Sequence, residues 1–73
     1  MEIAMLFKEL VREIRIKCNI SQKILAQWSD IDQVSISYYE RGSRKPGLLA
    51  RNKMIRVANE KAGMSIKDSD IEN

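Results

Sequence analysis

The chain has 73 residues, of which 44% are hydrophobic and 32% are charged, and its formal net charge is +3. One cysteine and no histidine exclude an internal disulfide, histidine-based catalysis and a Cys/His zinc site. No apolar run approaches the length of a membrane span, so we expect neither a membrane segment nor a signal peptide. This composition fits one small domain, residues 1–73, in a reducing cytoplasm.

The first predicted element is a helix from about Ile3 to Lys17. Apolar residues recur along it at steps of three and four: Ile3, Leu6, Phe7, Leu10, Val11 and Ile14. Asn19 is a residue type that accepts the left-handed conformation in which many helices end. The pattern predicts a helix with one broad apolar side.

Two short helices are predicted next, joined by a tight turn at residues 30–32. The first is capped by Ser21 and ends near Ser29, and the second runs from about residue 33 to 41. Asp32 suits the start of the second helix and Gly42 its end. Helices this short are not stable alone, so other helices must hold them.

The second of these helices leaves one small, uncharged, hydrogen-bonding face uncovered: Gln33, Val34, Ser37 and Tyr38. Such side chains read base edges in the major groove, where an amide pairs with adenine and an apolar group meets the thymine methyl. Ile36 and Tyr39 fall on the opposite side, where we expect them to pack in the core.

A fourth helix is predicted from Leu48 to about Ala62, ended by Gly63. A last turn or helix is predicted at residues 66–71, and because residues 65–73 are polar and terminal we expect them to fray. No segment has the pattern of a strand. The sequence therefore predicts an all-α fold, with four or five helices around one core.

The basic residues are unevenly distributed along the chain. Residues 41–56 hold six of them and no acidic residue: Arg41, Arg44, Lys45, Arg51, Lys53 and Arg56. Residues 57–73 hold two basic and four acidic residues. A basic stripe beside a candidate recognition helix is typical of proteins that bind a phosphate backbone.

Several positions in this part of the chain resemble the helix-turn-helix of the Cro/XRE phage-repressor family. They are Ser21 and Gln22, Leu25 and Ala26, Ile36, residues 40–42, and Pro46. The resemblance implies a compact, lambda-repressor-like bundle with the helix-turn-helix proper at about residues 21–41. Two positions depart from the family pattern, because Asp30 stands where Gly is usual and Ser29 stands where an apolar residue is usual.

The resemblance also implies roles for individual residues. Gln22 would contact a phosphate and brace Gln33, while Arg15 and Glu40 would form a structural ion pair. Further phosphate contacts would come from the loop after the third helix, namely Arg41, Ser43, Arg44 and Lys45. These contacts give affinity and register, whereas contacts to bases give sequence choice.

The expected function is that of a sequence-specific transcriptional regulator of double-stranded DNA, a repressor of phage, prophage or bacterial origin acting in the cytoplasm at the nucleoid. A homodimer on a palindromic operator is expected, since one such module reads few base pairs. Apolar residues available for the dimer contact are Leu48, Met54, Met64 and Ile66. The alternative is a protein-interaction module, such as an antitoxin or co-regulator, which would have no need of the basic loop. No enzymatic activity, cofactor or metal is expected.

Overall fold

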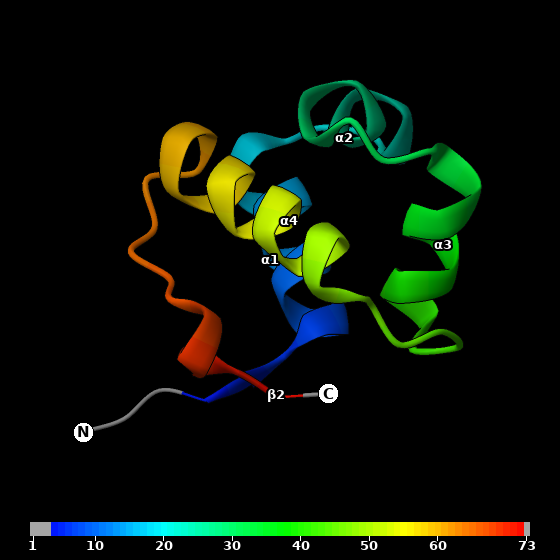
Figure 1. Ribbon diagram of the computed structural model, residues 1–73. Coiled ribbons are helices and arrows are strands. Elements are labelled where there is room, and N and C mark those ends of the chain that lie inside the picture. Colours follow the sequence, from blue (N-terminus) through cyan, green and yellow to red (C-terminus); the bar gives the residue numbers. More distant parts are fainter. Residues whose placement is uncertain (1–3, 73) are drawn as a thin grey trace.

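Residues 4–72 are described by the structure, a computed structural model, and most of them belong to four α-helices (Figure 1). These are α1 (Phe7–Cys18), α2 (Gln22–Ser29), α3 (Gln33–Arg41) and α4 (Leu48–Lys61). Short elements lie at the two ends of the described chain: β1 (Met5–Leu6), the 3-10 helix η1 (Asp68–Asp70) and β2 (Ile71–Glu72). The prediction of four or five helices around one core is confirmed.

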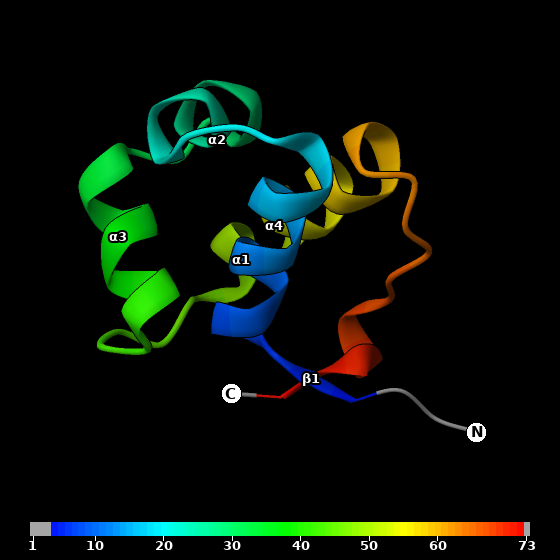
Figure 2. The ribbon, with the colours of Figure 1, turned by 180° about the vertical axis from the view of Figure 1, so that it is seen from behind.

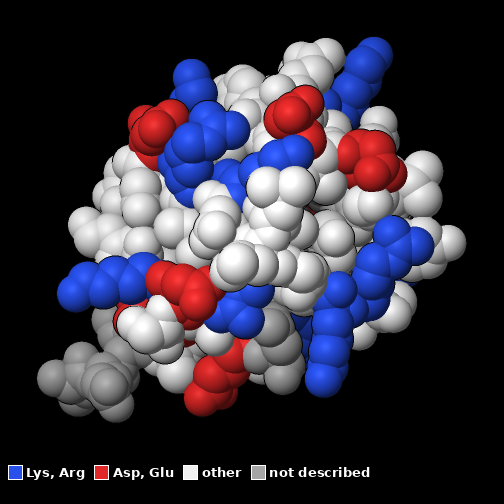
Figure 3. Space-filling model, in the orientation of Figure 1, with Lys and Arg blue, Asp and Glu red and all other residues white. Residues whose placement is uncertain are grey.

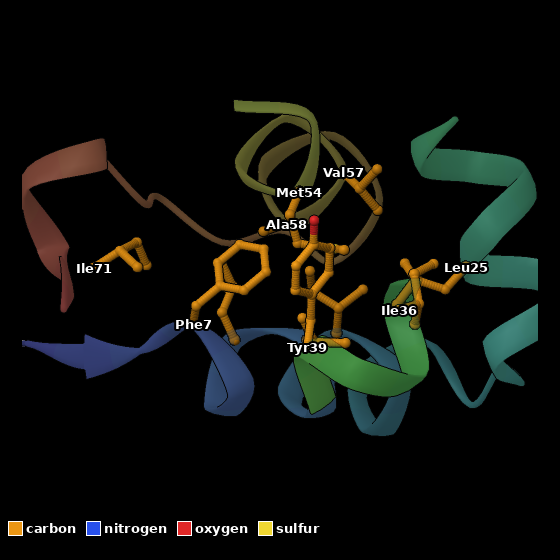
Figure 4. Close-up of a cluster of buried hydrophobic side chains, with 11 residues drawn as sticks. Phe7, Leu25, Ile36, Tyr39, Met54, Val57, Ala58 and Ile71 are labelled. Atoms are coloured by element: carbon orange, nitrogen blue, oxygen red, sulfur yellow. The ribbon is translucent and has the colours of Figure 1, made fainter. Parts of the chain in front are cut away.

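The core forms where α1 packs against α3 and α4. Leu10 and Ile14 of α1 have no solvent-accessible surface, and neither has Ile36 of α3. The rings of Phe7 and Tyr39 meet edge to face, with centroids 5.3 Å apart and planes at 88° (Figure 4). Full burial of one large apolar side chain contributes about 1.5–3 kcal/mol. These contacts therefore fix one side of α3 to the domain, as the sequence predicts for Ile36 and Tyr39.

Helix boundaries follow local sequence signals. The side-chain oxygens of Ser21 and Asp32 accept backbone N–H groups in the first turns of α2 and α3. Asn19 ends α1 in the left-handed conformation at φ 53°, and Gly42 ends α3 at φ 74°. These four positions agree with the sequence-based prediction, because each cap depends on residues within one helical turn.

α1 begins later than the sequence pattern predicts. The helix starts at Phe7, and Met5 and Leu6 form β1, which pairs in parallel with Ile71 and Glu72 of β2 (Figure 2). The prediction that the chain has no strand is therefore wrong, and the expected helical position Ile3 lies outside the described residues. The two-residue pairing depends on bringing opposite ends of the chain together, which no local pattern reveals.

The segment after α4 is docked on the domain, in contrast to the fraying that we expected. Asn59 exchanges two hydrogen bonds with the backbone of Ile66, at 3.0 and 2.8 Å. Arg51 donates to the Asp68 carboxylate at 3.0 Å and to the carbonyls of Asp68 and Ile71 at 3.0 and 3.1 Å. Ile71 is buried in the core. Side chains of α4 thus supply hydrogen-bond partners to this polar segment. The sequence of the segment alone does not predict that it packs on the domain.

α4 places its apolar residues differently from our expectation for a dimer contact. Met54 is fully buried among the core side chains, so its predicted place on a dimer surface is wrong (Figure 4). Met64 and Ile66 pack partly against the same core. In contrast, Leu48 and Leu49 at the start of α4 are each 69% exposed.

Candidate nucleic-acid interface

The turn between α2 and α3 accepts a residue with a side chain where the family pattern has Gly. Asp30 adopts the left-handed conformation, with φ 59° and ψ 37°. Lys53 of α4 donates to the Asp30 carbonyl at 3.0 Å and lies 3.5 Å from its carboxylate. Asp is one of the few non-glycine residues that visit this conformation, so the turn keeps its shape despite the departure.

α3 is held by one face and exposes the other. Gln33 at its first position is exposed, and the next residue, Val34, is 63% exposed. Ser37 and Tyr38, one turn further on, are half-buried. Because Ile36 is fully buried on the opposite side, the helix presents the face that the sequence predicts, with an amide and an apolar side chain at its start.

Two arginines lie against the second half of this face. The guanidinium carbons of Arg41 and Arg44 lie over the Tyr38 ring, 4.9 and 4.5 Å from its centroid. Arg41 Nη1 donates to Ser37 Oγ at 3.0 Å, and Arg44 Nη1 donates to Ser35 Oγ at 3.1 Å. The loop after α3 is thereby folded back along the helix, so that its charge lies beside the exposed face.

The six basic residues of the 41–56 segment fall into two groups. Three lie within salt-bridge distance of a carboxylate: Arg51, Lys53 and Arg56. The other three have no such partner among residues 4–72: Arg41, Arg44 and Lys45. In Figure 3, Lys and Arg gather at the lower right, the side on which the loop after α3 lies in Figure 1. Within the 41–56 segment, the positive charge without a carboxylate partner is therefore concentrated beside α3, more narrowly than the sequence indicates.

The carboxylate of Glu40, near the end of α3, connects α3 to α1 and α2. Glu40 Oε2 accepts from Arg15 Nη1 at 2.6 Å, and Glu40 Oε1 accepts from Gln22 Nε2 at 3.1 Å. Arg15 also donates to the carbonyl of Ile20 at 3.4 Å. The expected pair of Arg15 and Glu40 is present, joining α1 to the end of α3.

Gln22 has a different partner from the one that the resemblance implies. Its amide nitrogen binds Glu40, and the hydrogen bonds of the described residues include none between Gln22 and Gln33. The brace between the two glutamines is therefore absent from this structure. Gln22 instead fixes the start of α2 to the end of α3.

Asp32 has a pKa below its ordinary value of 3.8, mainly because its carboxylate accepts the backbone N–H of Ser35. The Ser35 hydroxyl donates a second hydrogen bond to the same carboxylate at 2.8 Å. Arg44 contributes a further, smaller lowering of the pKa through its positive charge. The start of α3 is thus stabilised by an ionised cap at neutral pH.

Two residues near this face were missed from the sequence. Ser35 connects Arg44 to Asp32, and Lys8 packs beside Gly42, where an added Cβ would lie 3.1 Å from Lys8 Cδ. Lys8, Arg44 and Lys45 also line a pocket of 220 Å³ between the start of α1 and the loop after α3. Ser35 lies in the first turn after the helix cap Asp32, which is a weak indication of its role in the local sequence. Lys8 is distant from α3 in the sequence, so no local pattern indicates that it lies near this face.

This geometry defines a helix-turn-helix domain with an exposed second helix and positive charge beside it. The family model described as a helix-turn-helix, of the Cro/C1 type, matches residues 11–50, more than half of the chain. The chain belongs to this family, whose domain implies DNA binding and whose members are typically regulators without enzymatic activity. Comparisons with curated proteins and with solved structures gave no match. Within residues 4–72, no helix has the length and hydrophobicity to cross a bilayer.

Proposed function

We propose that the protein is a sequence-specific transcriptional repressor of phage, prophage or bacterial origin, which reads the major groove of double-stranded DNA with α3. The observation that carries this proposal is the coincidence of the exposed α3 face with three cations that lack carboxylate partners in the described chain. A cation without a carboxylate partner has little free-energy cost in water. When it binds a DNA phosphate, counterions are released from the DNA, and this release favours binding.

The two ends of α3 have different roles in this proposal. Gln33 and Val34, at the exposed start, read base edges, with Ser37 one turn behind them. At the other end, phosphate contacts come from Arg41, the last residue of α3, and from three residues of the following loop: Ser43, Arg44 and Lys45. Gln22 would reach a phosphate through its amide oxygen, since its amide nitrogen is held by Glu40.

We further propose that the protein binds a palindromic operator as a homodimer. A domain of this size covers few base pairs, and two copies on half-sites about 34 Å apart double the recognised sequence. Leu48 and Leu49 are the most exposed large apolar residues of the described chain, which makes the start of α4 the best candidate for contact with a second copy. Large apolar side chains left in water commonly mark such contacts when they adjoin.

The test of the function is selection of binding sites from random duplex DNA by the purified chain. We expect an enriched sequence with two inverted half-sites at a fixed spacing. Enrichment of a single half-site would support base readout but contradict the dimer. Recovery of unselected sequence would contradict sequence-specific binding altogether.

The phosphate contacts are tested with two arginine variants that remove the same charge. Arg44→Ala should weaken binding to the selected operator and to random DNA by similar factors, and should reduce the salt slope by about 0.9 for each phosphate that is no longer neutralised. Arg56→Ala is the control, because Arg56 is equally charged but lies near Glu60 on α4. Equal effects of the two variants would show that only net charge matters.

A protein-interaction module is the second candidate, favoured by the exposure of Leu48 and Leu49. In that case a protein partner would cover the start of α4, and the cations beside α3 would have no nucleic-acid target. Substituting both leucines by serine separates the two candidates. A DNA-binding dimer should lose operator affinity but keep its binding to random DNA, whereas a pure interaction module should bind neither kind of DNA, before or after the change.

A further inference from the structure

Tyr38 lies beside two cations of the described surface. Two guanidinium groups lie within 5 Å of its ring centroid, those of Arg41 and Arg44. The face of an aromatic ring carries negative potential, so it attracts both cations. Two like charges that share one ring repel each other, and no carboxylate among residues 4–72 lies within salt-bridge distance of either. The ring is therefore a group that both cations share, and its negative face favours their proximity.

Two serine hydroxyls fix the positions of the same guanidinium groups. Ser37 accepts one hydrogen bond from Arg41, and Ser35 accepts one from Arg44. A guanidinium has five N–H donors, so each arginine retains most of its donors for another acceptor. Ser35 is itself held by Asp32 at the start of α3, which makes the position of Arg44 depend on a rigid helix end.

We propose that Tyr38 is a positioning residue, which holds Arg41 and Arg44 as a preformed clamp for DNA phosphates. Long arginine side chains lose much rotamer freedom when they bind, and a ring that orders them beforehand removes part of that cost. Planar guanidinium groups with several free donors match the geometry of phosphate oxygens. The inference rests on the proposed function and deepens it. The sequence predicts that Tyr38 reads bases, whereas here Tyr38 sets the affinity for DNA by positioning two arginines.

Tyr38→Phe and Tyr38→Leu separate these roles. Phe keeps the ring and removes only the hydroxyl, so it should leave the affinity within twofold of the wild type and leave the selected consensus unchanged. Leu removes the ring, and should weaken binding to the operator and to random duplex DNA alike, by about tenfold, which corresponds to about 1.4 kcal/mol. A loss of operator affinity or a change of consensus in Tyr38→Phe would overturn the inference, because the hydroxyl would then be reading DNA.

A positioning role also predicts coupling to the arginines. In a chain that already carries Arg41→Ala and Arg44→Ala, adding Tyr38→Leu should change DNA affinity by less than twofold. The full tenfold loss in that background would overturn the inference, since Tyr38 would then act on DNA without the arginines. If the wild type binds operator and Arg44→Ala weakens it while Tyr38→Leu does not, the inference fails and the proposed function stands. If the wild type binds no DNA, both fail.

A measurement on the wild type tests the inference even if a Tyr38 variant does not fold. Side-chain ¹⁵N relaxation at Nε of the arginines, in the free protein, should show higher order for Arg41 and Arg44 than for Arg12. Arg12 is the reference, because it is exposed and its one hydrogen bond in the described chain, to the Glu40 carbonyl, is 3.5 Å long. Equal disorder at all three arginines would show that no clamp is preformed.

Discussion

Replacing Ser29 with alanine should stabilise the protein. Ser29 is the last residue of α2, it has no solvent-accessible surface, and its hydroxyl has no hydrogen-bond partner in the described chain. An unsatisfied polar group in the interior costs about 1–3 kcal/mol relative to its hydrated state in the unfolded chain. Alanine removes that group and keeps the Cβ that packs in the core.

The expected gain is the removed penalty less the cost of a small void. A void smaller than a methyl group costs less than about 1 kcal/mol. Alanine also has a better helix propensity than serine, by at most about 0.5 kcal/mol. We therefore expect Ser29→Ala to raise the free energy of unfolding by about 1–2 kcal/mol. For a domain of this size each kcal/mol corresponds to roughly 4–8 °C in Tm.

Urea denaturation followed by circular dichroism measures the change directly, with the m-value as a check that the unfolded states are comparable. Ser21→Ala is the matched control, because it removes the same group from the other end of α2. The Ser21 hydroxyl accepts the N–H of Ile24 at 3.2 Å, so its loss should destabilise by about 1 kcal/mol. If Ser29→Ala proves neutral or destabilising, the Ser29 hydroxyl has a partner in solution and the reasoning from its burial is wrong.

Three further experiments test the scaffold and the recognition face. A double-mutant cycle with Arg15→Ala and Glu40→Ala should give a coupling of roughly 1 kcal/mol or more in unfolding free energy, and strict additivity would mean that their 2.6 Å contact contributes nothing. Asp32 has a lowered pKa in the folded state, so its stabilising effect is present above pH 3.8 and is lost as pH falls through the lowered pKa. The stability difference between wild type and Asp32→Asn should thus narrow on acidification, and a constant difference from pH 7 to pH 2 would contradict this. Gln33→Ala should cost about 1–3 kcal/mol on the selected operator and much less on random DNA, without loss of stability; an unchanged consensus would show that α3 does not read bases through Gln33.

The part of the fold that sequence predicts well is the part determined within one or two helical turns. Ser21, Asp32 and Gly42 mark helix ends through contacts to neighbouring residues. The apolar stripe of α1 likewise predicts which of its residues are buried, because helical periodicity alone assigns them to one face. The exposed face of α3 follows by the same reasoning once Ile36 and Tyr39 are assigned to the core.

What the sequence does not reveal depends on partners that are distant along the chain. Arg51 looks like part of a basic surface, yet its charge is paired with Asp68 in the segment after α4. Arg44 reaches back to Ser35, and that contact depends on how the loop after α3 folds. Met54 looks like a candidate for a dimer surface until the packing of α4 shows it fully buried. The local sequence pattern predicts on which face of its own helix a residue lies. It does not predict which other element covers that face.

The pairing of β1 with β2 has a consequence for the order of folding. Contacts within each helix and in the turn between α2 and α3 join residues that are close in sequence, and such contacts form quickly. Joining Met5 to Ile71 instead closes nearly the whole described chain for the sake of a two-residue ladder. The entropy of closing so large a loop is regained only after the helices have already brought the ends near each other. The ladder should accordingly form last and open first, as a separate unit of local unfolding that leaves α2 and α3 intact.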